Sequence, residues 1–412
     1  MNGALKLYSK CLSANPRRKF PIFAKAQQGL IKRVRKEMDY PRQGPTIWFH
    51  AASLGEYQVA RPLISRLKKM GPCTIVMTFF SPSGYRALEN SHPEIDHLFY
   101  LPLDTAHNAR AFIDAVSPDK AVFIISEYWP NILQELKFQA IPTYLVSAII
   151  REDSQFFRWY GRTYRRALSA FSRIFVLNES SRFNLRMLGY TDVSLSGDPL
   201  FDNASLVAAT PWTDETIERF KDGRQLFVAG SISDDKDLEI VSRLVRENPE
   251  TKFLLVPHDI NESTLRQLDS AIGQPVLRYS SAVADTDLAQ QRIMVLDTVG
   301  RLAFVYRYAT WAYVGGGFTP LLHSVIEATV YGVPVSFGPM IHRKVTPLQM
   351  IERGIGTMVS TPDEAARWLA GLKDNPEALA KIKADSLRYV EENLGAAHEL
   401  IQVISNGLWQ KK

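Results

Sequence analysis

Two carboxylates each follow a short apolar run that has the length of a strand. Glu56 comes after Thr46–Ala51 (TIWFHA) and a loop of small residues, and Glu127 directly follows Ala121–Ser126 (AVFIIS). Because the carboxyl ends of parallel strands meet at one edge of a sheet, we expect both acids to face one cleft. Each acid is suited to act there as a general base, or it only interacts favourably with the positive end of a helix. The residues alone leave both interpretations open.

A glycine-rich segment later in the chain has the composition of a nucleotide-binding turn. The apolar run WAYV leads into Gly315, Gly316 and Gly317, and a helix of about nine residues is predicted to follow. Glycines let a ligand approach the backbone, and N–H groups at a helix start suit a phosphate. His323 and Glu327, four residues apart, are predicted to share one helical face, where the carboxylate can accept both hydroxyls of a ribose. The alternative is a glycine-rich turn with a buried polar pair, since no dinucleotide-binding fingerprint is completed.

Two shorter turns are expected to contact the same ligand. Gly230 and Ser231 close the first apolar run of the second half of the chain, and His258 closes the next run. Each turn lies at the carboxyl end of an expected parallel strand, which is where open α/β sheets bind their ligands. Neither turn is specific when taken alone.

Alternating apolar runs and amphipathic stretches supply the scaffold for these residues. Such alternation predicts parallel strands covered on both faces by helices, and a polar interruption at Ser196–Thr213 divides them into two doubly wound α/β halves with a ligand cleft between them. The tail Asp374–Trp409 is predicted to be helical throughout. The expected domains are a basic segment, 1–42, an N-terminal domain, 43–205, a C-terminal domain, 206–385, and a C-terminal helix, 386–412. The expected strands are Thr46–Ala51, Thr74–Phe79, Leu98–Leu103, Ala121–Ser126, Thr143–Ile149 and Ile174–Leu177, then Leu226–Gly230, Phe253–Val256, Pro275–Tyr279, Ile293–Leu296, Trp311–Val314 and Pro334–Phe337.

Length and composition are those of a globular protein with more than one core. The chain has 412 residues, of which 46% are hydrophobic, and this excludes a disordered or low-complexity chain. Its two cysteines cannot form a disulfide framework or a cysteine zinc site, which favours a reducing, cytosolic setting. The sequence has no apolar stretch of about 18 residues and no signal-peptide pattern, so we expect neither a spanning helix nor translocation.

The positive charge is concentrated at one end of the chain. Residues 1–42 contain eleven Lys and Arg against two acids, whereas the remaining residues have a net charge of −3. This asymmetry predicts an anionic partner, and Phe156–Arg166 adds interleaved aromatic and basic residues. No nucleic-acid-reading module accompanies these segments, which favours an acceptor or membrane surface over nucleic acid. A basic helix that packs on the first domain and faces solvent is the alternative.

Taken in order, the segments of this chain resemble one family over nearly its whole length. It is similar to the 3-deoxy-D-manno-octulosonic acid (Kdo) transferases of lipopolysaccharide synthesis, in particular to Bacteroidetes-type sequences. The ordered set of segments is far more specific than any one of them. These segments are IWFHAASLGE, TFFSPSGY, FYLPLDTAHNARAFI, SEYWPNIL, SAIIREDSQFFRWYG, FVLNES, GDPLFD, VAGS, LDTVGRL and YVGGGFTPLLHSVIEATVYGVPVSFGP.

The resemblance implies a GT-B glycosyltransferase with two Rossmann-like domains, located peripherally on the cytoplasmic face of the inner membrane. It implies CMP-Kdo as donor, a lipid A precursor (lipid IVA) as acceptor, inversion at the anomeric carbon, and no metal or cofactor. Glu56 of ASLGE matches the family's catalytic base, and Glu127 of SEYWPN matches its second essential acid. The residues that correspond to its nucleotide side are Gly230, Ser231, His258, Gly315, Gly316, Gly317, His323, Ser324 and Glu327.

Departures from the family pattern cluster on the donor side. Ile232 follows Gly-Ser where the family has Thr, Ser324 follows the His where it has Asn, and Arg301 stands where an acid is common. Arg343–Pro347 replaces a Lys-Phe-x-Glu-Ala stretch. Two alternatives remain, another GT-B nucleotide-sugar transferase or epimerase, and a non-catalytic binding protein that retains the fold. The ASLGE and SEYWPN pair distinguishes the Kdo transferases from the other GT-B enzymes.

Overall fold

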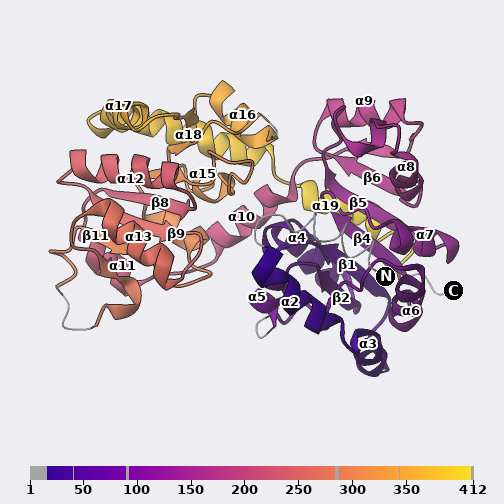
Figure 1. Ribbon diagram of the computed structural model, residues 1–412. Coiled ribbons are helices and arrows are strands. Elements are labelled where there is room, and N and C mark those ends of the chain that lie inside the picture. Colours follow the sequence, from indigo (N-terminus) through magenta and orange to yellow (C-terminus); the bar gives the residue numbers. More distant parts are fainter. Residues whose placement is uncertain (1–15, 40, 90–91, 284–286, 343, 410–412) are drawn as a thin grey trace. The chain divides into compact units, whose positions relative to one another are not determined.

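The protein consists of two compact units, each built around its own sheet (Figure 1). The computed structural model describes residues 16–39, 41–89, 92–283, 287–342 and 344–409, and no side chain before residue 22. The first unit, here the N-terminal unit, comprises residues 1–203 and 394–412, and the second, the C-terminal unit, comprises residues 204–393. The chain end therefore returns to the unit in which the chain begins.

The N-terminal unit contains a seven-stranded parallel sheet in the order β3-β2-β1-β4-β5-β6-β7. β1, β2, β4 and β5 are buried along their whole length, which explains why they are continuous apolar runs in the sequence. The six expected strands are confirmed with small shifts at their ends. The seventh, β7, was not predicted, because only one of its three residues is buried. The strands are β1 Thr46–Ala51, β2 Thr74–Phe79, β3 His97–Tyr100, β4 Lys120–Ile124, β5 Thr143–Ala148, β6 Arg173–Val176 and β7 Val193–Leu195.

Helices cover both faces of this sheet, so two separate cores form. Alternate side chains of β1 enter opposite cores, Ile47 and Phe49 on one face and Trp48 on the other. α4, α5 and α19 complete the first core, and α2, α3, α6, α7, α8 and α9 complete the second. The helical elements of this unit are α2 Pro16–Gln27, α3 Leu30–Met38, α4 Leu54–Met70, α5 Pro82–Leu88, α6 Ala106–Val116, α7 Pro130–Phe138, η1 Gln155–Phe157, α8 Arg162–Leu168, α9 Glu179–Met187 and α19 Ala396–Ile404, and α10 Pro199–Ala209 contains the boundary between the units.

The C-terminal unit repeats the architecture with a parallel sheet in the order β10-β11-β9-β8-β12-β13-β14. The six expected strands are again confirmed, and β14 is additional. Its strands are β8 Leu226–Ile232, β9 Lys252–Pro257, β10 Leu277–Arg278, β11 Ile293–Val295, β12 Trp311–Val314, β13 Val335–Phe337 and β14 Gly356–Met358. Its helical elements are α11 Glu215–Lys221, α12 Asp235–Glu247, α13 Glu262–Ile272, η2 Tyr279–Ser281, α14 Leu302–Val305, η3 Tyr306–Tyr308, α15 Ile326–Thr329, α16 Val345–Glu352, α17 Pro362–Lys373 and α18 Pro376–Glu392.

The prediction of one continuous helix over Asp374–Trp409 is wrong. α18 ends at Glu392, and α19 begins at Ala396 after Gly395, whose φ of +100° a side chain would rarely adopt. The Asp202 carboxylate accepts hydrogen bonds from the backbone N–H groups of Gly395 and Ala397, both 3.1 Å away. A carboxylate at the positive end of α19 thus fixes the returning chain to the N-terminal unit.

The described part of the basic segment packs on the N-terminal unit. Leu30, Val34 and Met38 of α3 are buried in its core, and Phe23 of α2 lies 4.8 Å from Phe80 between ring centroids. The remaining face of α3 is exposed and basic, formed by Lys32, Arg33, Arg35 and Lys36. Residues 1–15 lie outside the described part of the chain. Among the described residues, no helix has both the length and the hydrophobicity that a membrane span requires.

Candidate functional site

Glu56 is placed by the turn that joins β1 to α4. Ser53 caps the helix, and its side chain accepts a hydrogen bond from the backbone N–H of Glu56 at 3.5 Å. The Glu56 carboxylate in turn accepts a hydrogen bond from the backbone N–H of Ala52. This reciprocal arrangement is close to a capping box, so Glu56 has a structural role at the start of the helix as well as a position at the carboxyl end of β1.

Glu127 lies on a loop, not in a helix, so the expectation of an N-terminal helical acid is wrong. β4 ends at Ile124, and α7 begins only at Pro130. Ile125 has a φ of +65°, which is an outlier for a β-branched residue. Such strained backbone is typical of functional sites, and here it lies at the bend from which Glu127 is presented.

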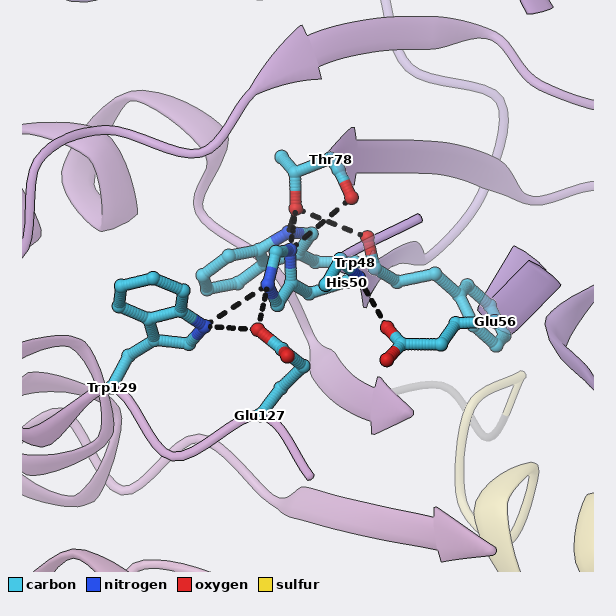
Figure 2. A network of polar contacts seen from close by, with 8 residues as sticks. Trp48, His50, Glu56, Thr78, Glu127 and Trp129 are labelled. Atoms are coloured by element: carbon cyan, nitrogen blue, oxygen red, sulfur yellow. Dashed lines mark hydrogen bonds and ion pairs between the residues drawn. The ribbon is translucent and has the colours of Figure 1, made fainter. Parts of the chain in front are cut away.

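His50, a residue that the sequence interpretation missed, connects directly to Glu127 (Figure 2). Its Nε2 lies 2.9 Å from Glu127 Oε2, and the Trp129 indole N–H donates to the same oxygen at 2.6 Å. On the other side of the ring, His50 Nδ1 lies 2.9 Å from the Thr78 hydroxyl, to which the Trp48 indole N–H donates at 2.8 Å. The signal was a lone histidine in the otherwise apolar run TIWFHA.

The two carboxylates are close enough to interact electrostatically. Burial, and then the charge of Glu127, raise the pKa of Glu56 to about 8, against two backbone hydrogen bonds that lower it. Glu56 is therefore a stronger base than an exposed carboxylate. The structure thus brings together both acids that the sequence singled out, at the carboxyl ends of the neighbouring strands β1 and β4.

The donor-side turns of the C-terminal unit are joined by a buried carboxylate that the sequence did not single out. Asp237 in the first turn of α12 is fully buried. It accepts hydrogen bonds from the backbone N–H groups of Ser233 and Gly316, both at 2.9 Å, and from the Tyr313 hydroxyl at 2.6 Å. Asp237 therefore holds the turn after β8 against the glycine turn after β12.

The glycine turn needs its glycines for two different reasons. Gly316 has a φ of +81°, a conformation that favours glycine. Gly317 lies so close to Gly338 that a Cβ would collide with backbone atoms. The N–H groups of Gly315 and Gly316 bond to Gly230 O and to Asp237, both at 2.9 Å. The N–H groups of these two glycines are therefore used within the protein, where they join the turns after β8 and β12.

The sequence predicted that His323 and Glu327 share one helical face, and this prediction is wrong. The helix α15 is only Ile326–Thr329, and turns replace the first part of the expected helix. His323 instead packs against His258, with ring centroids 4.4 Å apart and the ring planes tilted by 36°. Burial, and then the His258 charge, lower the pKa of His323 to about 4, so this imidazole is neutral near pH 7. Ser324, next to it, is partly exposed.

Glu327 lies near Tyr306, and the hydroxyl of Tyr306 lies against Gly230. Burial raises the pKa of Glu327 to about 7. Tyr306 is buried, and its pKa is raised well above the ordinary value by burial and by the charge of Glu327. A Cβ on Gly230 would collide with the Tyr306 hydroxyl, so Gly230 leaves the space that this ring occupies. Ser231, the next residue, has a φ of +55°.

The departures on the donor side have structural roles where the structure describes them. Ile232 is buried, and its carbonyl accepts the His258 backbone N–H at 2.9 Å. Arg301 forms an ion pair of 2.8 Å with Asp214, which is almost fully buried. Arg343 lies outside the described residues, and Lys344 is the first described residue of that stretch.

A pocket of about 240 Å³ opens beside His258, between the starts of α12 and α13. Asp234, Asp235 and Asp259 line it together with Thr264 and Gln267. Such a lining repels a phosphate and suits hydroxyl groups. Across the described ranges, no group of three or more His, Cys, Asp or Glu is arranged to hold a metal ion.

Sequence comparison matches this chain with Kdo transferases, whereas structure comparison shows only its fold. Residues 25–203 match the family described as 3-deoxy-D-manno-octulosonic-acid transferase (kdotransferase). The 3-deoxy-D-manno-octulosonic acid transferase of Rickettsia bellii is 24% identical over 87% of this chain and 87% of its own. That of Rickettsia felis is 26% identical over 92% of this chain and 82% of its own.

Among solved structures, a putative UDP-N-acetylglucosamine 2-epimerase from Listeria monocytogenes superposes with a TM-score of 0.63. It is 15% identical, and the match covers 90% of this chain and 98% of that chain. At this identity the likeness shows the fold alone, and that fold is the pair of Rossmann-like domains called GT-B. The sequence match includes both carboxylates and continues beyond them, so this chain is similar to 3-deoxy-D-manno-octulosonic acid transferases over most of its length.

Proposed function

We propose that the protein transfers Kdo from CMP-Kdo to a lipid A precursor in lipopolysaccharide synthesis. The observation that carries this proposal is the pair Glu56 and Glu127 at the carboxyl ends of β1 and β4, inside the segment that matches the Kdo-transferase family. The curated relatives are named 3-deoxy-D-manno-octulosonic acid transferases, and they align with most of the chain.

In the proposed reaction Glu56 is the general base. It removes the proton of the attacking sugar hydroxyl while the hydroxyl oxygen bonds to the anomeric carbon of Kdo. The bond from that carbon to the phosphate oxygen breaks, and CMP leaves with the electron pair. Attack from the face opposite to CMP inverts the anomeric centre. Burial suits Glu56 for this role, because the resulting pKa of about 8 lets it hold the proton that it accepts.

We assign donor binding to the turns of the C-terminal unit. Glu327, beside Tyr306, accepts the ribose hydroxyls, and the neutral His323 donates from its ring N–H to the phosphate. Ser231 and Gly317 contribute backbone at the two turns that Asp237 holds together. These groups stabilise a leaving phosphate without a metal ion, and activity that persists in a chelator is the corresponding test.

We assign the acceptor and membrane surface to the N-terminal unit. Trp159 is 92% exposed, and Phe183 and Met187 on α9 are 61% and 67% exposed. Basic residues that are exposed or partly exposed lie next to them in the sequence, after η1 and on α8 and α9, namely Arg158, Arg162, Arg166, Arg182 and Arg186. Exposed aromatic and basic side chains together are typical of surfaces that bind anionic bilayers, and an acylated acceptor stays in the bilayer.

Incubation with CMP-Kdo and a lipid A precursor, followed by mass spectrometry of the lipid, tests the proposal. We expect a product that is heavier by one or more Kdo units and that forms at the same rate with EDTA. In Glu56→Gln we expect the rate of its formation to fall by about a hundredfold to ten-thousandfold. UDP-N-acetylglucosamine in a parallel reaction tests the epimerase alternative. Absence of any Kdo-bearing product from the folded wild-type protein would refute the proposed function.

A further inference from the structure

Two N–H donors converge on one oxygen of Glu127. His50 Nε2 lies 2.9 Å and Trp129 Nε1 lies 2.6 Å from Glu127 Oε2. The His50 side chain is fully buried, and the Glu127 side chain is only 12% exposed, so bulk water competes little for these contacts. Hydrogen bonds to an ionised group are about twice as strong as neutral ones, and low local polarity strengthens them.

The hydrogen-bond partners of both ring nitrogens bear on where the His50 proton lies. Trp48 Nε1 donates to Thr78 Oγ1 at 2.8 Å, which leaves the hydroxyl proton for His50 Nδ1 at 2.9 Å; the competing acceptor, the Phe49 carbonyl, is farther away at 3.3 Å. With Nδ1 accepting, a neutral imidazole has its proton on Nε2, directed at Glu127. The other tautomer can donate to the Thr78 carbonyl at 3.2 Å and accept from the Trp129 indole N–H at 3.0 Å, but it turns a lone pair toward the Glu127 carboxylate.

These contacts link His50 to the carboxylate pair. We propose that His50 is a positioning residue, which donates from Nε2 to hold the Glu127 carboxylate in place, so that Glu127 turns its charge toward Glu56. This inference rests on the proposed function, in which Glu56 is the base. Trp129 supports His50 from the loop before α7 (Figure 2).

The consequence falls on Glu56. The charge of Glu127 is the second cause, after burial, of the pKa of about 8 at Glu56. If Glu127 loses its donors, its carboxylate is no longer held beside Glu56. Glu56 then no longer faces a fixed negative charge, its pKa falls, and it becomes a weaker base.

A matched pair of substitutions separates donation from packing. The amide nitrogen of Gln can occupy the place of Nε2, so His50→Gln keeps a donor toward Glu127. His50→Asn places its amide toward Thr78 and leaves Glu127 without this donor. Trp129→Phe removes the second hydrogen-bond donor to Glu127 and keeps a ring against Phe80. It is the alternative test variant if His50→Asn does not fold. The control is Trp409→Phe, which removes an indole hydrogen bond to Pro72 O in the same unit, away from both acids.

Two readouts are needed. Steady-state kinetics of Kdo transfer give kcat and KM, and ¹³C NMR of labelled Glu carboxyls, assigned with Glu56→Gln, gives the pKa of Glu56 without substrate. For His50→Asn and Trp129→Phe, measured above pH 8 where Glu56 is ionised in every variant, we expect kcat to fall by about tenfold to a hundredfold, the equivalent of one hydrogen bond to a charged group, with little change in KM. The pKa of Glu56 should fall below its wild-type value. His50→Gln should restore most of both, and Trp409→Phe should match the wild type.

Two results would overturn the inference. One is a His50→Asn protein whose kcat and Glu56 titration stay within twofold of the wild type. The other is an equal loss in His50→Asn and His50→Gln, which would mean that the ring only fills space. The NMR titration needs neither CMP-Kdo nor a lipid A precursor. It therefore tests the role of His50 even if the wild-type protein fails to transfer Kdo and the proposed function is refuted.

Discussion

The Tyr306 hydroxyl lies directly against Gly230, in the space that a side chain at position 230 would fill. We expect Gly230→Ala to destabilise the C-terminal unit by about 1–3 kcal/mol, the usual cost of inserting a methyl group into a filled core. Tyr306→Phe removes the colliding oxygen, so Gly230→Ala/Tyr306→Phe should recover part of the loss. Recovery is incomplete because Leu302 Cδ1 and Tyr306 Cζ also lie 3.0 Å from the added Cβ.

Urea unfolding of the two single variants and the double variant measures this coupling. The control is Tyr306→Phe in the wild-type background, since its own effect has to be subtracted in a double-mutant cycle. Strictly additive losses would show that the hydroxyl does not limit the space at position 230.

Activity should depend on pH through Glu56. A general base must be ionised, and burial together with the Glu127 charge raises the pKa of Glu56 to about 8. We therefore expect kcat/KM to fall tenfold per pH unit below about 8 and to level off above it. The pH dependence of kcat/KM with CMP-Kdo in excess measures this, and an acidic limb near the ordinary glutamate pKa would contradict it.

Glu56 should also make folding stability depend on pH, and stability should fall with rising pH where activity increases. The folded-state pKa of Glu56 is raised from 4.5 to about 8, so the folded protein binds more protons than the unfolded chain between these values. The contribution of Glu56 is complete below the unfolded pKa and is lost as the pH rises toward 8. Glu56→Gln should thus gain stability relative to the wild type across this range, measured by thermal unfolding. A difference that does not change with pH would contradict this.

Nucleotide affinity should respond to Glu327. An ionised carboxylate accepts ribose hydroxyls better than a neutral one, and burial raises the pKa of Glu327 to about 7. Cytidine, which has no phosphate to titrate, should bind more tightly as the pH rises through 7. Glu327→Gln should remove this dependence and weaken binding by about tenfold to a hundredfold in calorimetric titrations. Unchanged affinity would make Glu327 a structural residue of α15.

Membrane binding should depend on the exposed aromatic residues of the N-terminal unit. We expect Trp159→Ser to reduce sedimentation with anionic vesicles and to leave the fold intact, because this side chain is 92% exposed. The matched control is Met70→Ser, which removes an exposed apolar side chain at the end of α4. Salt should weaken binding further, since each basic residue near an anionic surface contributes about 1 kcal/mol. Equal sedimentation of both variants and the wild type would exclude this surface.

The sequence by itself determined the two parallel sheets and the place of Glu56. Strands covered on both faces must be apolar along their whole length, so β1, β2, β4 and β5 were readable as continuous runs. Glu56 was readable because capping is local, with Ser53 only three residues away. β7 was missed because an edge strand of three residues, with one buried, has no such run.

The tertiary structure alone decided which residues meet His50. The strand order β2-β1-β4 pairs His50 with Thr78 on one side and with Phe123 on the other, and so brings Glu127 to its Nε2. Strand order depends on how helices fill the spaces between distant segments, and no local pattern encodes it. His323 shows the same limit, since a partner from the turn after β9, His258, holds its ring outside any helix.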